Sequence, residues 1–207
     1  MTERRMIHIV DDEDAIRRSA SFMLKTSGFD VQTWASGVAF LKEARTVQAG
    51  CILLDVRMPE MDGLEVQQAL TASGVAMPVI VLTGHGDISI AVRAMKAGAV
   101  DFIEKPFEKA KLLDAIEAGF AQLDDKAGRA ERAGDAMTAI AALTDRERDV
   151  LEGLAQGLPN KTIAYDLGIS PRTVEVHRAN LMTKLNVRSL SDALRLAFAA
   201  GLGRSGI

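Results

Sequence analysis

The stretch "CILLDVRMPEMDG", residues 51–63, begins with four apolar side chains and then reaches a single carboxylate at Asp55. A continuous apolar run of this length is typical of a strand that is covered on both faces, as in parallel sheets. Directly after Asp55 come Val56, Arg57 and a turn built on Pro59, Asp62 and Gly63. The pattern predicts a central strand that ends in a carboxylate at one edge of a sheet.

Four further apolar runs predict the other strands of this sheet. They span residues 6–10, 31–34, 79–82 and 100–103, and segments of helical length separate them. Strands that alternate with helices are typical of an α/β fold, with a doubly wound parallel sheet and right-handed crossovers. Ligands of such sheets bind at the carboxyl ends of the strands, so the functional residues are expected there.

The composition describes an ordinary globular protein. The chain has 207 residues, of which 48 % are hydrophobic and 26 % charged, enough apolar mass for one large or two small domains. Its single cysteine excludes an internal disulfide and fits a reducing compartment. The N-terminus lacks the apolar core of a signal peptide, and no stretch approaches the roughly 18 apolar residues of a membrane span. We therefore expect a cytoplasmic protein without a membrane partner.

The charges are distributed unevenly along the chain. Residues 1–123 carry 13 basic and 17 acidic side chains, whereas residues 168–207 carry 6 and 2. An acidic front and a basic tail indicate two domains with different partners, and nucleic acid is the candidate partner of the tail. Chance fluctuation on solvated surfaces is the alternative explanation.

We expect three parts: an α/β domain over residues 1–123, a linker over 124–141 and an all-α domain over 142–207. The linker is rich in Ala and charge, which favours a partly helical segment over a flexible one. Four helices are predicted in the tail, with a turn "LGIS" that suggests a helix-turn-helix. Their capping residues are Thr144 with Glu147 as a capping box, Asn160, Ser170 before Pro171, and Ser189.

Three carboxylates follow two of the predicted strands. Asp11 and Asp12 end the first strand and Asp55 ends the third. If these strands are neighbours, the carboxylates converge, and each raises the pKa of the others. A hard cation with oxygen ligands, such as Mg²⁺, would make the cluster tolerable. Taken alone, the Asp11–Asp12 pair could instead cap the next helix.

A hydroxyl and an ammonium are predicted at the same edge of the sheet. Thr83 ends the fourth strand, and Lys105 follows the fifth. Together with Mg²⁺ these groups suit a phosphoryl group, whose charge spreads over three oxygens. A carboxylate that attacked it would form an acyl phosphate. A cis peptide between Lys105 and Pro106 would aim the lysine over the site.

The predicted second helix of the helix-turn-helix has two different faces. Val174, Leu181 and Leu185 form its core face, and Arg178 lies at the edge of that face. The opposite face suits the major groove of DNA, although a mixed surface helix of an all-α module is the alternative. The candidates for reading bases are Arg172, Thr173, Glu175, Val176, Ala179 and Asn180, and those for binding phosphates are Lys161, Arg178, Lys184 and Arg188.

The motifs "VDDE", "LLDVRMPEMDG", "VLTGHGD" and "EKPF" resemble the receiver domain of two-component response regulators. The tail, with "LTDRE", "LGISPRTVEVH" and "KL", is similar to the four-helix DNA-binding domain of the LuxR type. The combination resembles the FixJ/NarL class of response regulators, and within it the FixJ subgroup. The resemblance implies a flavodoxin-like sheet with the strand order 2-1-3-4-5.

The resemblance also implies roles for the residues of the receiver. Asp55 would accept a phosphoryl group from a sensor histidine kinase. Mg²⁺ would be bound by Asp11, Asp12, Asp55 and the backbone carbonyl of Arg57. Thr83 and Lys105 would bind the phosphoryl group, and Phe102 would change rotamer with Thr83. Two positions would tune dephosphorylation, namely Arg57 and His85.

The implied output is control of transcription rather than enzymatic turnover on external substrates. Phosphorylation would produce a homodimer through helix 89–97 and strand 100–104, and the dimer would bind promoter DNA and work with RNA polymerase. The FixJ subgroup implies activation of oxygen-responsive or nitrogen-fixation genes. The alternatives are a regulator of another pathway, an adaptor that acts as a phosphate sink without binding DNA, and a Mg²⁺-dependent phosphohydrolase.

Overall fold

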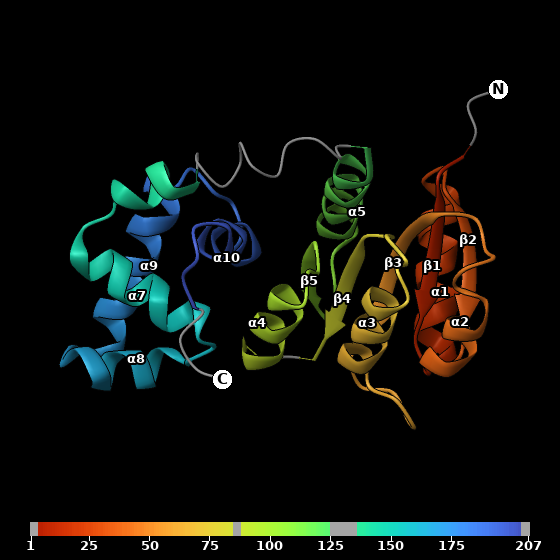
Figure 1. Cartoon of the computed structure of the whole chain (residues 1–207), viewed down its shortest axis with the longest axis horizontal. Coiled ribbons are helices and arrows are strands. Elements are labelled where there is room, and N and C mark those ends of the chain that lie inside the picture. The colour runs from red at the N-terminus through yellow and green to blue at the C-terminus, as the bar shows by residue number, and fades with distance from the viewer. Residues whose placement is uncertain (1–3, 85–87, 125–135, 204–207) are drawn as a thin grey trace. The chain divides into compact units, whose positions relative to one another are not determined.

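The structure is a computed structural model that describes residues 4–84, 88–124 and 136–203. The described residues divide into two compact units (Figure 1), one with residues 4–84 and 97–124 and one with residues 88–96 and 136–203. Most of the predicted linker, residues 125–135, lies outside the described residues, and residues 136–141 are helical. The domain boundaries after residues 123 and 141 stay predictions.

The first unit is built on one parallel sheet. Among the described residues its five strands have the order β2-β1-β3-β4-β5, which confirms the predicted fold. Asp55 belongs to β3 and pairs with Leu82 of β4, so the carboxylate is part of the strand itself. The strands are β1 (Met6–Val10), β2 (Asp30–Trp34), β3 (Gly50–Asp55), β4 (Val79–Thr83) and β5 (Asp101–Glu104).

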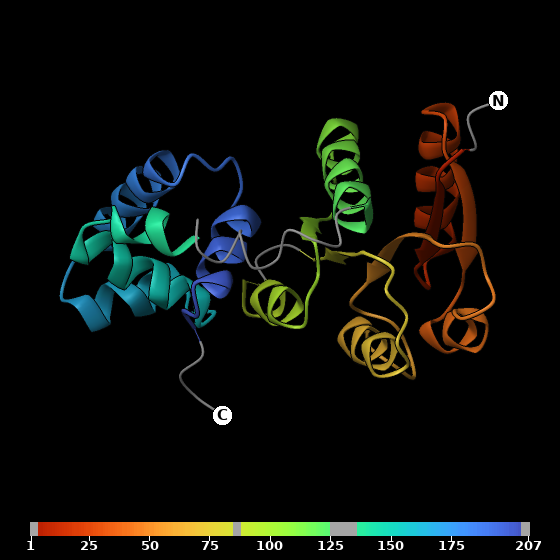
Figure 2. The ribbon, with the colours of Figure 1, turned by 45° about the horizontal axis from the view of Figure 1, so that its top comes forward.

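Helices cover both faces of the sheet (Figure 2). Helices α1 (Asp14–Thr26) and α5 (Lys109–Asp124) lie on one face, and α2 (Gly37–Glu43) and α3 (Gly63–Ala72) lie on the other. Helix α4 (Ile88–Lys96) follows β4 in the chain. Because both faces are covered, strands in the middle of the sheet need apolar side chains on both sides.

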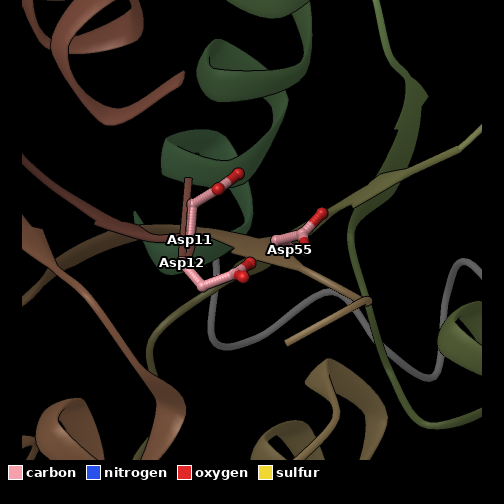
Figure 3. Close-up of side chains that lie close together, drawn as sticks. All are labelled: Asp11, Asp12 and Asp55. Atoms are coloured by element: carbon pink, nitrogen blue, oxygen red, sulfur yellow. The ribbon is translucent and has the colours of Figure 1, made fainter. Parts of the chain in front are cut away.

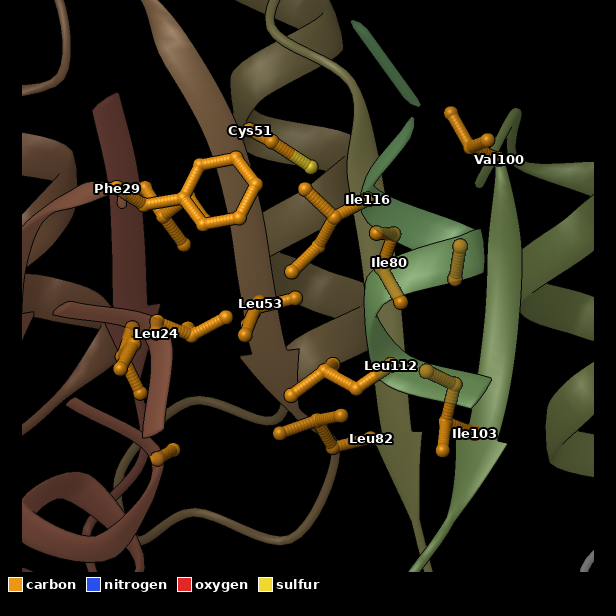
Figure 4. Packing of buried hydrophobic residues seen from close by; sticks show 14 of the residues in the cluster. Leu24, Phe29, Cys51, Leu53, Ile80, Leu82, Val100, Ile103, Leu112 and Ile116 are labelled. Carbon is orange, nitrogen blue, oxygen red and sulfur yellow. The ribbon is translucent and has the colours of Figure 1, made fainter. Parts of the chain in front are cut away.

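The core on the α1 and α5 face explains the sequence of β3. Cys51 and Leu53 of that strand pack with Leu24 of α1 and with Leu112 and Ile116 of α5 (Figure 4). Side chains alternate along a strand, so Ile52 and Leu54, which are also buried, point to the other face. The prediction that this run is buried on both faces is confirmed.

The second unit contains the predicted helices of the tail. They are α7 (Asp145–Ala155), α8 (Asn160–Leu167), α9 (Pro171–Lys184) and α10 (Leu190–Ala199). Thr144 and Glu147 form the predicted capping box, and Ser170 and Ser189 cap α9 and α10. The core face of α9 is also as predicted, because Val174, Leu181 and Leu185 are buried.

The predicted cap of α8 is wrong. Pro159 is the N-cap residue, and Asn160 is the first residue of the helix. The side chain of Asn160 is used differently, because its Oδ1 accepts a hydrogen bond of 3.0 Å from Nη1 of Arg178. Asn160 therefore joins α8 to α9 instead of closing the end of its own helix.

Within the described residues, no helix combines the length and the hydropathy that crossing a bilayer requires.

Candidate functional site

The three predicted carboxylates meet at the carboxyl ends of β1 and β3 (Figure 3). Asp11, Asp12 and Asp55 each offer an oxygen, and these oxygens lie within 4.8 Å of one another. The cluster forms because β1 and β3 are neighbours in register, so both strands reach the edge of the sheet at the same level. Asp11 and Asp55 are buried, whereas Asp12 is exposed.

Lys105 reaches the same cluster from the loop after β5. Its Nζ lies 2.7 Å from Oδ2 of Asp11 and 2.7 Å from Oδ1 of Asp55, so one ammonium bridges the two buried carboxylates. The backbone N–H of Lys105 donates to the carbonyl of Thr83 at 2.8 Å. The peptide bond between Lys105 and Pro106 is cis, as predicted.

Burial and neighbouring charges shift the pKa values of the bridging pair. Burial raises the pKa of Asp55, the ammonium of Lys105 lowers it, and the charges of Asp11 and Asp12 raise it again, so that the net shift is upward. Burial alone would lower the pKa of Lys105, but its contacts with Asp11 and Asp55 outweigh burial and raise it. Lys105 therefore stays charged and partly neutralises the cluster.

The donor set fits a hard divalent cation. It consists of carboxylate oxygens from three residues at one place, and oxygen ligands are what Mg²⁺ prefers. Three carboxylates and one ammonium leave an excess of negative charge, which a dication would balance. Mg²⁺ keeps several water ligands in most protein sites, and the exposed position of Asp12 leaves room for them.

The other predicted receiver residues lie around this cluster with different degrees of exposure. Thr83 is buried at the end of β4, and its hydroxyl donates to the carbonyl of Gly84 at 3.1 Å. Phe102 is half-buried in β5, opposite Val81 of β4. Arg57 is exposed two residues after Asp55. His85, a predicted tuning position, lies outside the described residues, and the roles assigned to these side chains stay predictions.

Gly63 determines how closely α3 approaches the site. A Cβ atom at this position would lie 2.2 Å from the carbonyl oxygen of Asp55, closer than any side chain could be placed. The backbone N–H of Gly63 donates to the carbonyl of Val56 at 2.9 Å. The glycine thus lets the start of α3 pack directly behind Asp55. The sequence shows it only as part of a turn.

Sequence reasoning missed Arg17, which lies in the second turn of α1. Its Nη1 donates to the carbonyl of Asp11 at 2.8 Å and to the carbonyl of Asp12 at 2.7 Å. The arginine therefore binds the backbone of two predicted metal ligands. The only signal in the sequence is its position five residues after Asp12.

The predicted DNA-reading face of α9 is open to solvent. Val176 is 52 % exposed, an unusual position for an apolar side chain, and Arg172, Glu175, Ala179 and Asn180 are exposed too. Thr173 is only half-buried, and its hydroxyl is hydrogen-bonded to the capping hydroxyl of Ser170 at 2.8 Å. The surface has the apolar and polar groups that the major groove can accept.

Two of the four predicted phosphate-binding side chains are engaged within the tail. Nζ of Lys184 lies 2.7 Å from Oε2 of Glu147, which is buried, and this contact contributes most to holding the pKa of Glu147 down at about 2. Arg178 is half-buried and donates to Asn160 of α8. Both contacts join α9 to a neighbouring helix. Lys161 and Arg188 are exposed.

Two known protein families match different parts of the chain. The family described as "response regulator receiver domain" matches residues 7–117, which contain the acidic cluster. The family described as "bacterial regulatory proteins, luxR family" matches residues 141–197, which contain α7, α8 and α9.

Similar proteins extend over nearly the whole chain. The transcriptional regulatory protein FixJ of Azorhizobium caulinodans is 48 % identical, with 98 % of this chain and 96 % of the relative covered. FixJ of Rhizobium meliloti is 49 % identical, with 96 % and 98 % covered. A crystal structure of full-length FixJ from B. japonicum has a TM-score of 0.59 and 45 % identity, with 97 % of this chain and 98 % of that chain covered.

Proposed function

The chain belongs to the response regulators that join a receiver domain to a LuxR-type DNA-binding domain, and we propose that phosphorylation of Asp55 controls its binding to promoter DNA. It is a transcription factor of the FixJ/NarL class and not a classical enzyme. The observation that supports the proposal best is the bridge of Lys105 between the buried carboxylates of Asp11 and Asp55. In this bridge the carboxylate proposed to accept the phosphoryl group lies beside the ammonium proposed to bind its oxygens.

The receiver domain implies a histidine kinase as partner. In the proposed reaction a carboxylate oxygen of Asp55 attacks the phosphorus of the phosphodonor, a P–O bond to Asp55 forms, and the bond to the leaving group breaks. The phosphoryl oxygens then accept from Lys105, which is already 2.7 Å from Asp55, and from the hydroxyl of Thr83. This hydroxyl would have to turn from the carbonyl of Gly84, and the rotamer change of Phe102 would follow.

Asp11, Asp12, Asp55 and the carbonyl of Arg57 would hold Mg²⁺, which when bound screens the negative charge that builds up during phosphoryl transfer. Arg57 and His85 would set how fast water removes the phosphoryl group. The negative charge and the oxygen donors of the cluster of Asp11, Asp12 and Asp55 support the proposed Mg²⁺ site.

The helix-turn-helix implies binding to DNA. We propose that phosphorylation produces a homodimer through helix α4 and strand β5, which places two copies of α9 on a two-fold site. The exposed face around Val176 would read bases. The phosphate-binding side chains would be the exposed Lys161 and Arg188 together with Arg178 and Lys184. RNA polymerase would be the next partner on the promoter, and the protein would act in the cytoplasm.

The target genes form a separate proposal. The resemblance to the FixJ subgroup supports activation of oxygen-responsive or nitrogen-fixation genes. Recovery of genomic fragments bound by the phosphorylated protein tests it. Fragments from promoters of an unrelated pathway would contradict this part and leave the phosphorylation mechanism untouched.

The phosphoacceptor is tested by labelling the full chain with radioactive acetyl phosphate and MgCl₂. The wild type should be labelled and Asp55→Asn should not, because an amide oxygen is too weak a nucleophile to attack the phosphorus of acetyl phosphate. Asp62→Asn is the matched control, since Asp62 caps α3 nearby and asparagine caps helices equally well. Label that persists in Asp55→Asn would show that another group accepts the phosphoryl group.

A further inference from the structure

Arg17 is the one cation of α1 that contacts the backbone of the β1–α1 loop among the described residues. Its side chain is only 16 % exposed, and its Nη1 donates to two successive carbonyls, those of Asp11 and Asp12. A second nitrogen, Nη2, donates to Oδ1 of Asp14 at 3.1 Å. The next residue, Arg18, also pairs with Asp14, at 2.8 Å, but its side chain is 81 % exposed. The two neighbouring arginines therefore share a partner and differ in their contact with the loop.

The two carbonyl contacts fix the peptide planes on either side of Asp12. In a trans peptide the carbonyl and the following N–H point in opposite directions. With the carbonyl of Asp12 turned toward Arg17, the N–H of Glu13 points the other way, where it donates to Oδ1 of Asp11 at 2.9 Å. The peptide bond between Asp12 and Glu13 thus connects the guanidinium of Arg17, at its carbonyl, to the carboxylate of Asp11, at its N–H.

The same contacts matter for Asp12. Asp12 is exposed, so core packing does not hold its side chain in place. The direction of its Cα–Cβ bond follows from the backbone torsions of Asp12, and these are set when the peptide planes before and after its Cα are both fixed. The N–H of Asp11 donates to the carbonyl of Trp34 at 3.2 Å, which anchors the loop at its other end.

We propose that Arg17 is a positioning residue of the metal site: by binding both carbonyls it holds the carboxylates of Asp11 and Asp12 in the arrangement that accepts Mg²⁺. The inference rests on the proposed metal-assisted phosphorylation of Asp55. Groups behind the direct ligands of a metal commonly change its affinity by about 10-fold to 100-fold.

The positive charge of Arg17, considered alone, predicts the opposite effect on Mg²⁺ affinity. A guanidinium repels a cation, so its removal would tighten Mg²⁺ binding if charge were its only contribution. Lysine keeps the charge but lacks the planar fork of donors that binds two carbonyls and Asp14 together. Arg17→Gln and Arg17→Lys therefore separate position from charge, and Arg18→Gln removes one charge from the same turn without touching the loop.

Calorimetric titration of the full-length protein with MgCl₂ measures the effect. We expect the Kd for Mg²⁺ to rise about 10-fold or more in Arg17→Gln and in Arg17→Lys. In Arg18→Gln it should stay within about 2-fold of the wild type, because exposed ion pairs contribute little. The temperature is set below the melting midpoint that each variant shows without Mg²⁺, so that folded proteins are compared.

Labelling with acetyl phosphate over a range of MgCl₂ concentrations provides a second readout. The concentration at half-maximal rate should rise in both Arg17 variants, and the maximal rate should stay near that of the wild type, because Asp55 and Lys105 are unchanged. Three results would overturn the proposal: unchanged Kd values in both variants, tighter binding in Arg17→Gln with a wild-type Kd in Arg17→Lys, or an equal loss in Arg18→Gln. A wild type that binds no Mg²⁺ would instead refute the proposed metal site, and with it the role of Arg17.

Discussion

At the scale of single residues, the site depends on how Lys105 compensates two buried carboxylates. Burial of Asp55 costs free energy when it is ionised, which is why its pKa is raised even beside an ammonium. A raised pKa in the folded state stabilises the fold below the ordinary pKa of the group. That stabilisation is lost as the pH rises through the folded-state value. Ionised Asp55 therefore lowers the stability of the fold relative to its protonated form.

Replacement of Lys105 by methionine should make this cost larger. Without the ammonium, burial and the charges of Asp11 and Asp12 act on Asp55 unopposed, so its pKa should rise further in Lys105→Met. The carboxyl carbon of Asp55, followed by ¹³C NMR during a pH titration without Mg²⁺, reports this pKa directly. A pKa equal to or below that of the wild type would show that Lys105 does not compensate Asp55.

At the scale of elements, the strands and most of the helix starts follow from local patterns. Apolar runs predicted all five strands, and serine and threonine caps predicted three helix starts, because these signals act within a few residues. Asn160 was predicted as a cap and instead binds Arg178, a residue 18 positions away. Contacts of that length depend on how helices pack, and no local pattern records them.

The ion pair between Glu147 and Lys184 is the other contact of this kind. The sequence presents Glu147 as part of a capping box and Lys184 as a phosphate contact, while the structure joins the two. One carboxylate thus caps α7 and holds the end of α9, the helix proposed to enter the major groove. Glu147 is buried, so it depends on Lys184 for its charge partner.

Lys184→Met should therefore destabilise the fold of the tail. A buried carboxylate left without its cation costs about 1–3 kcal/mol, whereas Arg188→Met, at an exposed position, should change stability by less than about 0.5 kcal/mol. Urea unfolding measures the difference.

In DNA titrations at several salt concentrations, Arg188→Met should reduce the number of released ions by about one.

The pH dependence of stability provides a check on the same ion pair. The pKa of Glu147 is lowered to about 2, so its contribution to stability is complete above the ordinary pKa of a glutamate. That contribution is lost as the pH falls from about 4.5 toward 2. Glu147→Gln, which preserves the capping box, should remove this part of the acid sensitivity. If Lys184→Met and the wild type were equally stable, the ion pair with Glu147 would not stabilise the tail, and DNA binding would be the remaining role of Lys184.

At the scale of the whole molecule, the receiver site could be predicted from the sequence more completely than the groups that support it. Asp11, Asp12, Asp55, Thr83 and Lys105 all stand at strand ends, and a parallel sheet brings strand ends to one edge. Arg17 and Gly63 act through the backbone of the loops beside the site. Which carbonyl a side chain binds, and which glycine packs behind a carboxylate, become visible only once the chain is folded.

At the same scale, a phosphoryl group on Asp55 is proposed to control the affinity of α9 for promoter DNA. Pairing of two receivers would raise this affinity without any new base contact, since linked binding sites gain from each other. The control must therefore be absent when Asp55 cannot be phosphorylated, while the DNA-binding surface itself is unchanged.

The most direct test measures the Kd of the full-length protein for a bound genomic fragment, with and without acetyl phosphate and MgCl₂, by fluorescence anisotropy. We expect the phosphodonor to lower the Kd of the wild type by about 10-fold or more. The Kd of Asp55→Asn should not respond and should equal that of the untreated wild type. A wild type that does not respond, or an Asp55→Asn variant that responds equally, would show that phosphorylation of Asp55 does not control DNA binding.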